Sequence, residues 1–285
     1  MTEWDWDGSV AVVTGAASGI GRALAEQLAR RGCRLMLADV EAPALASAVL
    51  ELSESHPGVE VASHVTDVSV GAEVDALASS TLERFGRVDV VCNNAGVGSA
   101  APIWELTEAD WNWVLGVNLW GVIHGIRAFV PHLIAQGHGH IVNTASMAGL
   151  LAPPGMAPYV ASKHAVVGLS ESLYGELRGA GHHVGVTVIC PGWVNTRIYQ
   201  SDRNRPEAVP NRDAADPETQ AAINELAAAF FESAMSAETV ATLAIEAVEA
   251  GRFWVLTHPE MSPAITARFD AAVHGENPSL GNPFQ

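Results

Sequence analysis

The sequence predicts an α/β fold, a doubly wound parallel sheet of about seven strands flanked by helices. Short apolar runs alternate with longer amphipathic stretches, which is the pattern of strands joined by covering helices. A chain of 285 residues can form one large domain of this kind, and its 26 glycines and 15 prolines supply the turns. We therefore expect residues 1–285 to form a single domain.

Seven short apolar runs are predicted to be strands, because they are mostly rich in β-branched residues and bounded by polar or turn-forming residues. They are Val10–Thr14, Leu35–Ala38, Val61–Val65, Val88–Cys92, Ile141–Thr144, Val184–Ile189 and Phe253–Leu256. Amphipathic stretches between them predict helices near 19–31, 71–85, 107–136, 159–179 and 237–250. The stretch 107–136 is long enough to contain two helices.

Two segments depart from this alternation. Residues 197–235 follow a predicted strand, are first rich in Pro, Asn, Asp and Arg, and then become helical over 221–231. An insertion of this length is typical of a substrate lid or a mobile loop. Residues 270–285 show no clear period and are predicted to be a C-terminal tail.

The charge and cysteine content exclude several classes of protein. With 15 Lys+Arg against 32 Asp+Glu, the net charge of −17 argues against a nucleic-acid or anionic-membrane partner. The acidic N-terminus does not resemble a secretory signal, and no run of 18 apolar residues predicts a membrane span. Cys33, Cys92 and Cys190 lie far apart in apolar stretches, which favours buried reduced thiols in a cytoplasmic protein.

Lysine is used only once in the chain, at Lys163, whereas arginine occurs 14 times. A GC-rich genome explains the bias toward arginine. The exception is informative, because a surface lysine could have been an arginine, whereas a compact ammonium at a reactive centre is not freely exchanged.

A glycine-rich turn follows the first predicted strand and opens the first helix. Thr14–Gly21 carries glycines at Gly15, Gly19 and Gly21, with Ser18 and Ile20 between them. Glycines let the backbone approach a pyrophosphate at a helix N-terminus. The order of strand, glycines and helix is typical of the dinucleotide-binding Rossmann fold.

The second predicted strand leads into Asp39, whose carboxylate can accept hydrogen bonds from the hydroxyls of an adenosine ribose. It would repel a 2′-phosphate, and Val40 next to it provides no compensating charge, so the sequence favours NAD over NADP. Arg22 or Arg34 could still approach such a phosphate. Asp39 could also act as a helix N-cap, alone or in addition.

Tyr159 and Lys163 lie four residues apart at the start of a predicted helix and therefore share one face. A phenol titrates near pH ~10, and a neighbouring ammonium together with the positive nicotinamide of NAD⁺ would lower that pKa. This pair indicates a general acid and base.

Two further polar residues fit the same chemistry. Ser146 follows a predicted strand and could donate to a substrate oxygen that gains charge, although loop serines are common. Asn118 lies inside a predicted helix, where asparagine is unfavourable, which indicates a specific duty such as bending the helix and holding a water.

Together these segments resemble the classical short-chain dehydrogenase/reductase (SDR) family over about residues 8–200. The matching segments are Thr14–Gly21, Asn93–Gly96, Asn118, Ser146, Tyr159, Lys163 and Pro191-Gly192. The resemblance implies a catalytic tetrad of Asn118, Ser146, Tyr159 and Lys163, in which Asn118 holds a water of a proton relay. It also implies a homotetramer or homodimer built on the helices 107–136 and 159–179.

The cofactor contacts expected from the glycine turn, Asp39 and the resemblance form one set. They are Gly15, Ser18, Gly19, Ile20, Gly21, Asp39, Asp67, Val68, Asn94, Ala95, Gly96, Tyr159, Lys163, Pro191, Gly192, Val194 and Thr196. The substrate pocket is predicted from apolar residues near the tetrad, namely Met147, Leu150, Met156, Trp193 and Tyr199.

The predicted function is NAD(H)-dependent hydride transfer between a small hydrophobic secondary alcohol and its ketone, with Tyr159 as general acid and base. One alternative is an NADPH-dependent ketone or 3-oxoacyl reductase. Another is a non-catalytic module that senses a dinucleotide, which need not keep all four tetrad residues. No metal is expected, because the 11 histidines lack partners at ligand spacing.

Overall fold

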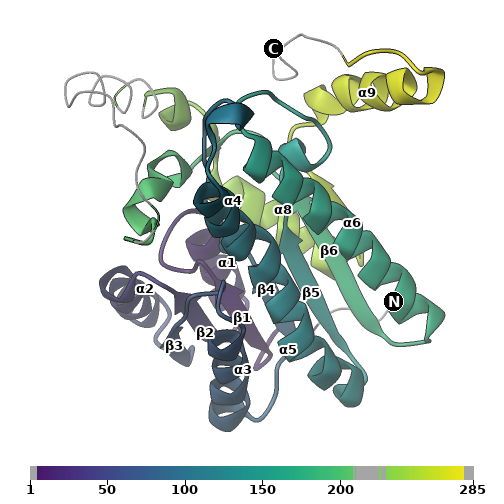
Figure 1. The fold of residues 1–285 in the computed structure, drawn as a ribbon. Coiled ribbons are helices and arrows are strands. Elements are labelled where there is room, and N and C mark those ends of the chain that lie inside the picture. Colours follow the sequence, from purple (N-terminus) through teal and green to yellow (C-terminus); the bar gives the residue numbers. More distant parts are fainter. Residues whose placement is uncertain (1–4, 208, 210–224, 226–228, 279–285) are drawn as a thin grey trace.

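The computed structural model describes residues 5–207, 209, 225 and 229–278. Its described residues form a seven-stranded, wholly parallel sheet of strand order β3-β2-β1-β4-β5-β6-β9 (Figure 1). The strands are β1 (Val10–Thr14), β2 (Arg34–Asp39), β3 (Val61–Val65), β4 (Val90–Asn93), β5 (Gly139–Thr144), β6 (Val184–Cys190) and β9 (Trp254–Leu256). The prediction of a doubly wound α/β fold is confirmed. A separate short pair joins β7 (Val194–Asn195) to β8 (Met235–Ser236).

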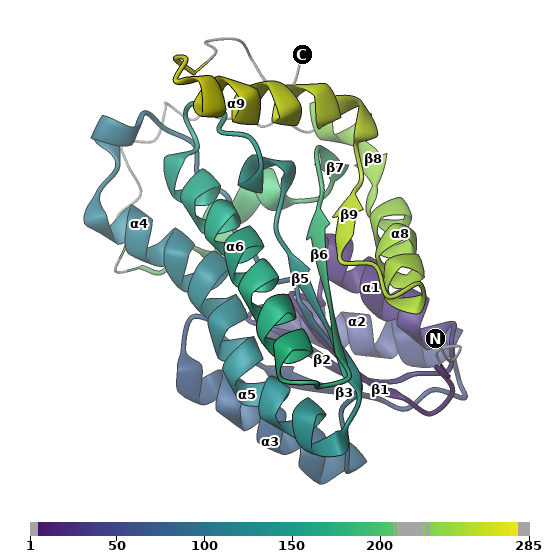
Figure 2. The same cartoon turned by 90° about the vertical axis from the view of Figure 1, so that its right-hand side faces the viewer.

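Helices cover both faces of the sheet (Figure 2). One face carries α1 (Gly19–Ala29), α2 (Ala42–Ser55) and α8 (Ala237–Glu249), and the other carries α3 (Gly71–Phe85), α5 (Gly121–Gln136) and α6 (Ala157–Gly179). Helix α4 (Glu108–Leu115) packs on α6, and α9 (Ser262–His274) crosses the top of the view in Figure 2.

Two of these helices, α2 and α9, were absent from the sequence prediction. Each has a proline in its first turn, Pro43 and Pro263. A proline is tolerated there because the first helical N–H groups have no partner within the helix. Helix α9 continues to His274, so the first residues of the expected tail are helical. Residues 279–285 of that tail, and most of the helix expected over 221–231, lie outside the described residues.

The core explains why the strands read as nearly continuous apolar runs. On β1, Ala11 and Val13 pack toward α1 and α8, while Val10 and Val12 pack toward α3 and α5. A parallel sheet covered on both faces buries every position. Strands β1 and β4 are neighbours at the point where the strand order reverses, and ligands bind in the crevice outside the carboxyl ends of such strands.

The stretch predicted as one or two helices over 107–136 contains α4, a π-helical turn over Gly116–Trp120, and α5. By length and composition, Glu108–Gln136 could cross a membrane. In the fold it packs against the sheet, with Phe129 and Leu133 fully buried, as a core helix does.

His140 makes the stability of the sheet depend on pH. It lies on β5, is 3% exposed, and its Nε2 hydrogen-bonds the hydroxyl of Thr187 on β6 at 2.8 Å. Burial lowers the pKa of His140 to about 3. A histidine in the unfolded chain titrates near pH ~6.5, so the unfolded state binds one more proton between about pH 6.5 and 3.

We therefore expect the free energy of unfolding to lose up to about 1.4 kcal/mol per pH unit from this group as the pH falls below about 6.5. Urea unfolding at pH 7, 6 and 5 measures this dependence. His140→Gln should reduce the slope of the unfolding free energy against pH by the contribution of one proton. His183→Gln, which changes an exposed histidine, should leave that slope unchanged. Parallel curves for the wild type and His140→Gln would contradict the assignment.

Candidate active site

The glycine-rich turn has the shape of a phosphate cradle. Gly15 and Gly19 have φ angles of +66° and +54°, which favour glycine. A Cβ on Gly15 would lie 2.9 Å from the Cα of Ala95, and one on Gly19 would lie 3.1 Å from the side chain of Thr196. The turn leads directly into the N-terminus of α1, where backbone N–H groups favour an anion.

Gly21 is placed differently from Gly15 and Gly19. It does not line the cavity, and a Cβ there would collide with the carbonyl oxygen of Gly15. Its lack of a side chain lets α1 pack on the turn, and its expected contact with a cofactor stays a prediction.

Asp39 ends β2 beside this turn. Its Oδ2 accepts a hydrogen bond from the backbone N–H of Ala17 at 3.0 Å, and its Oδ1 accepts one from the N–H of Glu41 at 3.0 Å. The carboxylate thus fixes the glycine turn relative to the start of α2, and it lines the cavity. A carboxylate has lone pairs for about four hydrogen bonds, so acceptor capacity remains.

Asn94 holds the crevice between β1, β4 and β5 together. Its Nδ2 donates to the carbonyl of Thr14 at 3.0 Å, and its Oδ1 accepts from the hydroxyl of Thr144 at 3.2 Å. The Thr14 hydroxyl in turn accepts from the backbone N–H groups of Asn94 and Ala95. The amide therefore positions the walls of the crevice and also lines it.

Asn118 lies in the π-helical turn and is fully buried. Its Oδ1 accepts from the N–H of Val97 at 2.8 Å, and its Nδ2 donates to the carbonyl of Val97 at 2.9 Å and to the hydroxyl of Ser162 at 3.2 Å. A π-turn is a common interruption at functional sites. The side chain fastens this turn to the loop after β4 and to α6, and it does not itself line the cavity.

Tyr159 and Lys163 lie on the first turns of α6, as their spacing predicted. The Lys163 Nζ donates to the carbonyl of Thr144 at 2.8 Å and lies 5.6 Å from the centre of the Tyr159 ring. Ser146 begins a short turn after β5, and its side chain hydrogen-bonds Tyr159. The three side chains line one wall of the cavity.

The pKa values of Tyr159 and Lys163 are governed mainly by burial. Burial raises the pKa of Tyr159, and the hydrogen bond from Ser146 opposes that change. Burial lowers the pKa of Lys163 to about 8. In the protein alone the expected lowering of the phenol pKa is therefore absent, because desolvation outweighs the opposing hydrogen bond from Ser146. Part of the predicted lowering comes from the positive nicotinamide of bound NAD⁺.

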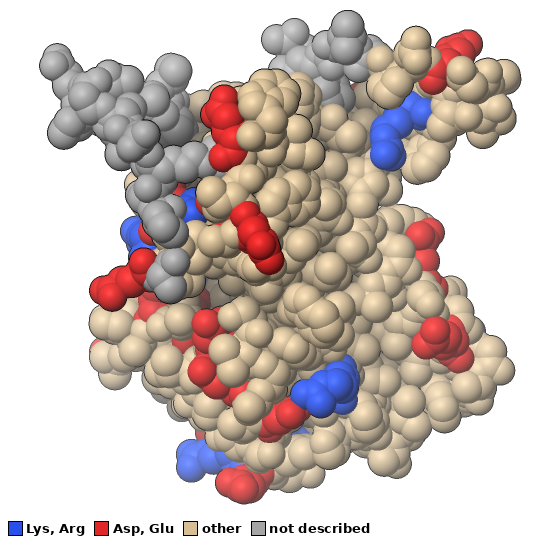
Figure 3. Space-filling view, in the orientation of Figure 1, with Lys and Arg blue, Asp and Glu red and all other residues tan. Residues whose placement is uncertain are grey.

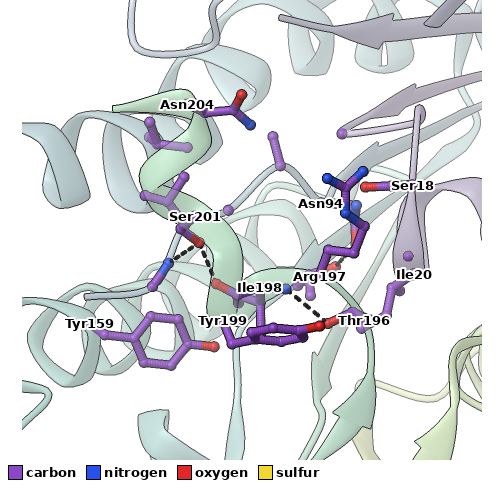
Figure 4. Close-up of a pocket in the computed structure, with 18 of the residues that line it drawn as sticks. Ser18, Ile20, Asn94, Tyr159, Thr196, Arg197, Ile198, Tyr199, Ser201 and Asn204 are labelled. Atoms are coloured by element: carbon purple, nitrogen blue, oxygen red, sulfur yellow. Dashed lines mark hydrogen bonds between the residues drawn. The ribbon is translucent and has the colours of Figure 1, made fainter. Parts of the chain in front are cut away.

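A cavity of about 700 Å³ joins the glycine turn to Tyr159. Of the expected cofactor residues, those that line it are Gly15, Ser18, Gly19, Ile20, Asp39, Asp67, Val68, Asn94, Ala95, Gly96, Tyr159, Lys163, Pro191, Gly192, Val194 and Thr196. A volume of this size is normal for a cofactor and substrate site. Figure 4 shows Ser18 and Ile20 on one side of this space, Tyr159 on the opposite side and Tyr199 between them.

Two residues expected in the substrate pocket do not line it. Met147 is fully buried, and Leu150 is nearly so. Ser146 caps a 3₁₀ turn over Met147–Gly149, and this turn directs both side chains into the core shared with α6 and β6. Met156, Trp193 and Tyr199 do line the cavity.

An aromatic wall on this side of the cavity was only partly predicted. Phe231 stacks on Tyr199 with ring centres 5.3 Å apart and packs edge-on against Trp193 at 5.8 Å. Phe231 lies 72 residues after Tyr159 in the chain, within a stretch that the sequence showed only to be helical. Tertiary folding alone brings it to the site.

The cysteines and histidines form no second centre in the part of the chain that is described. Cys33, Cys92 and Cys190 are buried free thiols, as predicted. Among the residues searched, which exclude those outside the described ranges, no group of His, Cys, Asp and Glu could hold a metal ion.

Comparisons with known proteins show similarity in sequence to dehydrogenases. Residues 9–207 match the family model of the short chain dehydrogenases. A CLA biosynthesis dehydrogenase/reductase of Lactiplantibacillus plantarum is 35% identical, over 97% of each chain. A 1-deoxy-11-beta-hydroxypentalenate dehydrogenase of Streptomyces exfoliatus is 36% identical, over 91% of this chain and 86% of that one.

Among solved structures, a short-chain dehydrogenase/reductase of Burkholderia phymatum in complex with NAD is similar in fold and sequence. It is 47% identical, covers 98% of this chain and 99% of its own, and gives a TM-score of 0.91. The chain belongs to the classical short-chain dehydrogenase/reductase family of NAD(P)-dependent oxidoreductases.

Proposed function

We propose that the protein interconverts a hydrophobic secondary alcohol and its ketone with NAD(H) as the cofactor. The observation that carries this proposal is the shared wall of Ser146, Tyr159 and Lys163 in a cavity that continues to Asp39. An acid–base group and a carboxylate suited to a ribose are thus joined by one space, as hydride transfer from a dinucleotide requires.

The glycine turn and Asp39 fit a dinucleotide, because the turn leaves room where side chains would otherwise project, and the carboxylate keeps acceptor capacity beside it. When bound, the nicotinamide ring would supply the hydride acceptor or donor. The candidate contacts stay those that line the cavity, among them Pro191, Gly192, Val194 and Thr196 from the segment after β6.

The protein's own residues transfer the proton and position the substrate oxygen. During oxidation the Tyr159 phenolate takes the hydroxyl proton of the alcohol, and during reduction the phenol returns it to the oxygen. The Ser146 hydroxyl holds that oxygen by a hydrogen bond. Lys163 stabilises the phenolate by its positive charge, while the carbonyl of Thr144 fixes its ammonium group.

The preference for NAD is supported by where the arginines lie. Arg34 begins β2, at the opposite end of the strand from Asp39, and donates to the carbonyl of Gly8. Arg22 lies near Glu26 and pairs with Glu51. Neither residue lines the cavity. The similar protein from Burkholderia phymatum was solved with NAD.

An apolar substrate is supported by the aromatic wall of Trp193, Tyr199 and Phe231. The relative from Streptomyces exfoliatus is named for the dehydrogenation of a hydroxylated pentalenate. The arginines of the cavity, Arg197 and Arg203, are engaged by Gln200 and Glu41. Their guanidinium groups are therefore less available to bind the acidic carrier of a 3-oxoacyl substrate than those of a free basic cluster would be. A 3-oxoacyl substrate is for this reason the weaker alternative.

The test is a cofactor-reduction screen. Purified protein is mixed with NAD⁺ or NADP⁺ and a panel of cyclic, terpenoid and steroid-like secondary alcohols, and the absorbance of reduced nicotinamide is followed. We expect turnover with NAD⁺. Turnover with NADP⁺ alone would contradict the cofactor assignment. Tight NAD binding without turnover of any alcohol or of the matching ketones would favour a non-catalytic dinucleotide sensor.

We infer that the protein acts as a homodimer or homotetramer built on α5 and α6, in the cytoplasm and without a nucleic-acid or membrane partner. On the face in Figure 3, Lys and Arg side chains lie apart from one another and most lie beside acidic ones, which does not suit a polyanion. Trp120, at the start of α5, is 52% exposed, so this region has apolar surface to bury. Sedimentation velocity measures the assembly.

A further inference from the structure

Glu41 connects two segments that are far apart in the sequence. It lies two residues after Asp39, just before α2, and its Oε1 accepts hydrogen bonds from Arg203 Nε and from Asn204 Nδ2, both at 2.9 Å. Arg203 and Asn204 end the 3₁₀ turn Ile198–Asn204, the first part of the expected lid. Figure 4 shows this turn running beside the cavity from Tyr199 to Asn204.

The lid turn has other attachments that do not depend on Glu41. The hydroxyl of Ser201, which is 4% exposed, accepts from the backbone N–H of Gly98 at 2.8 Å. Arg205 pairs with the buried carboxylate of Asp110 and lies over the ring of Trp113 at 4.4 Å. Removal of the charge on Glu41 should therefore leave the turn in place.

The guanidinium of Arg203 is oriented independently of Glu41 as well. Its Nη1 donates to the carbonyls of Arg197 and Gln200, both at 3.0 Å. Without the carboxylate partner, the Nε–H would remain positioned as a donor. Such a preorganised donor binds a phosphate oxygen well, because charge-assisted hydrogen bonds are among the stronger ones in proteins.

Glu41 and Arg203 lie at the same end of the cavity as Asp39. All three residues line the cavity, and the backbone N–H of Glu41 donates to Asp39 Oδ1 at 3.0 Å. The side chains of Arg203 and Glu41 are only 25% and 26% exposed. Their charges are therefore less screened than those of a surface pair, and each largely cancels the other at that end of the cavity.

We propose that Glu41 is a second cofactor-specificity residue, which occupies Arg203 and so withholds this lid arginine from the 2′-phosphate of NADP(H). The proposal rests on the proposed use of NAD(H). Asp39 disfavours the phosphate by repulsion, whereas Glu41 acts by removing the cation that would otherwise offset this repulsion. The same contact ties the lid turn to the adenosine end of the site.

The test is equilibrium binding of NADH and NADPH, measured by titration calorimetry, which requires no substrate. Glu41→Gln keeps an amide oxygen for Asn204 but removes the charge that holds Arg203. We expect the Kd for NADPH to fall about tenfold, the size expected for one charge-assisted hydrogen bond, and the Kd for NADH to change less than about threefold.

Two further variants make the test specific. Glu41→Gln combined with Arg203→Gln should lose the gain in NADPH affinity, because no guanidinium then remains for the 2′-phosphate. Glu238→Gln breaks an exposed contact with Arg30, outside the cavity, and should change neither Kd.

Each outcome separates this inference from the proposed function. An unchanged NADPH affinity in Glu41→Gln, or a gain that persists without Arg203, would overturn the role of Glu41. A wild-type protein that binds neither cofactor would instead refute the proposed function.

Discussion

Tyr159→Phe is expected to lower kcat by about a thousandfold or more, while the Kd for NADH stays within about threefold of the wild type. The substitution removes only the hydroxyl. The ring itself stays in the cavity lining, and Lys163 remains bound to the carbonyl of Thr144. The loss should therefore appear in the proton-transfer step, and not in cofactor binding or folding.

Two measurements test this expectation, namely steady-state turnover with an alcohol from the screen and calorimetric titration with NADH. Tyr174→Phe is the matched control, because it makes the same change on the same helix α6, where Tyr174 packs on Phe253 away from the cavity. Its activity should equal that of the wild type. Substantial turnover by Tyr159→Phe would show that another group moves the proton.

The sheet and the glycine turn could be predicted because their physical requirements are local. A strand buried on both faces, such as β1, must be apolar at nearly every position, and this shows in the sequence. Gly15 and Gly19 adopt positive φ angles close to other backbone or side-chain atoms, where only glycine fits easily. The positions of the glycines in the sequence therefore predict the shape of the turn. The i and i+4 positions of Tyr159 and Lys163 follow from helical geometry alone.

The parts that could not be predicted depend on contacts across the fold. Met147 and Leu150 are apolar loop residues in the sequence, and nothing local indicates that a 3₁₀ turn directs them into the core. Phe231 reaches the site from a distant segment. Glu41 and Arg203 are 162 residues apart, and neither is unusual for a surface residue until the fold joins them.

Asn118 lies between these two cases. An asparagine inside a predicted helix indicated an interruption, and the helix is indeed interrupted by a π-turn at that point. Its partners, the backbone of Val97 and the hydroxyl of Ser162, come from other segments and could not be identified from the pattern. The buried amide thereby holds the loop after β4 against α6, near the residues expected to react. Its expected role in holding a water stays a prediction.

Lys163→Arg is expected to lower kcat/KM by about a hundredfold or more, even though the positive charge is kept. The Lys163 side chain is 3% exposed, and its Nζ lies 2.8 Å from the carbonyl of Thr144. Gly96 and Asn118 also border this space, since a Cβ on Gly96 would lie 3.6 Å from Nζ and 3.4 Å from Asn118 Oδ1. A planar guanidinium is bulkier than an ammonium, so we expect it to displace the phenol.

The control for Lys163→Arg is Arg178→Lys, the reverse exchange near the C-terminal end of α6 and outside the cavity, which should leave kcat/KM unchanged. If Lys163 also binds the ribose of the cofactor, Lys163→Arg should raise the Kd for NADH several-fold, whereas Tyr159→Phe should not. The two variants then differ in binding while both fail in turnover. Equal activity of Lys163→Arg and the wild type would mean that any cation suffices at this position, and that the single lysine of the chain reflects composition and not chemistry.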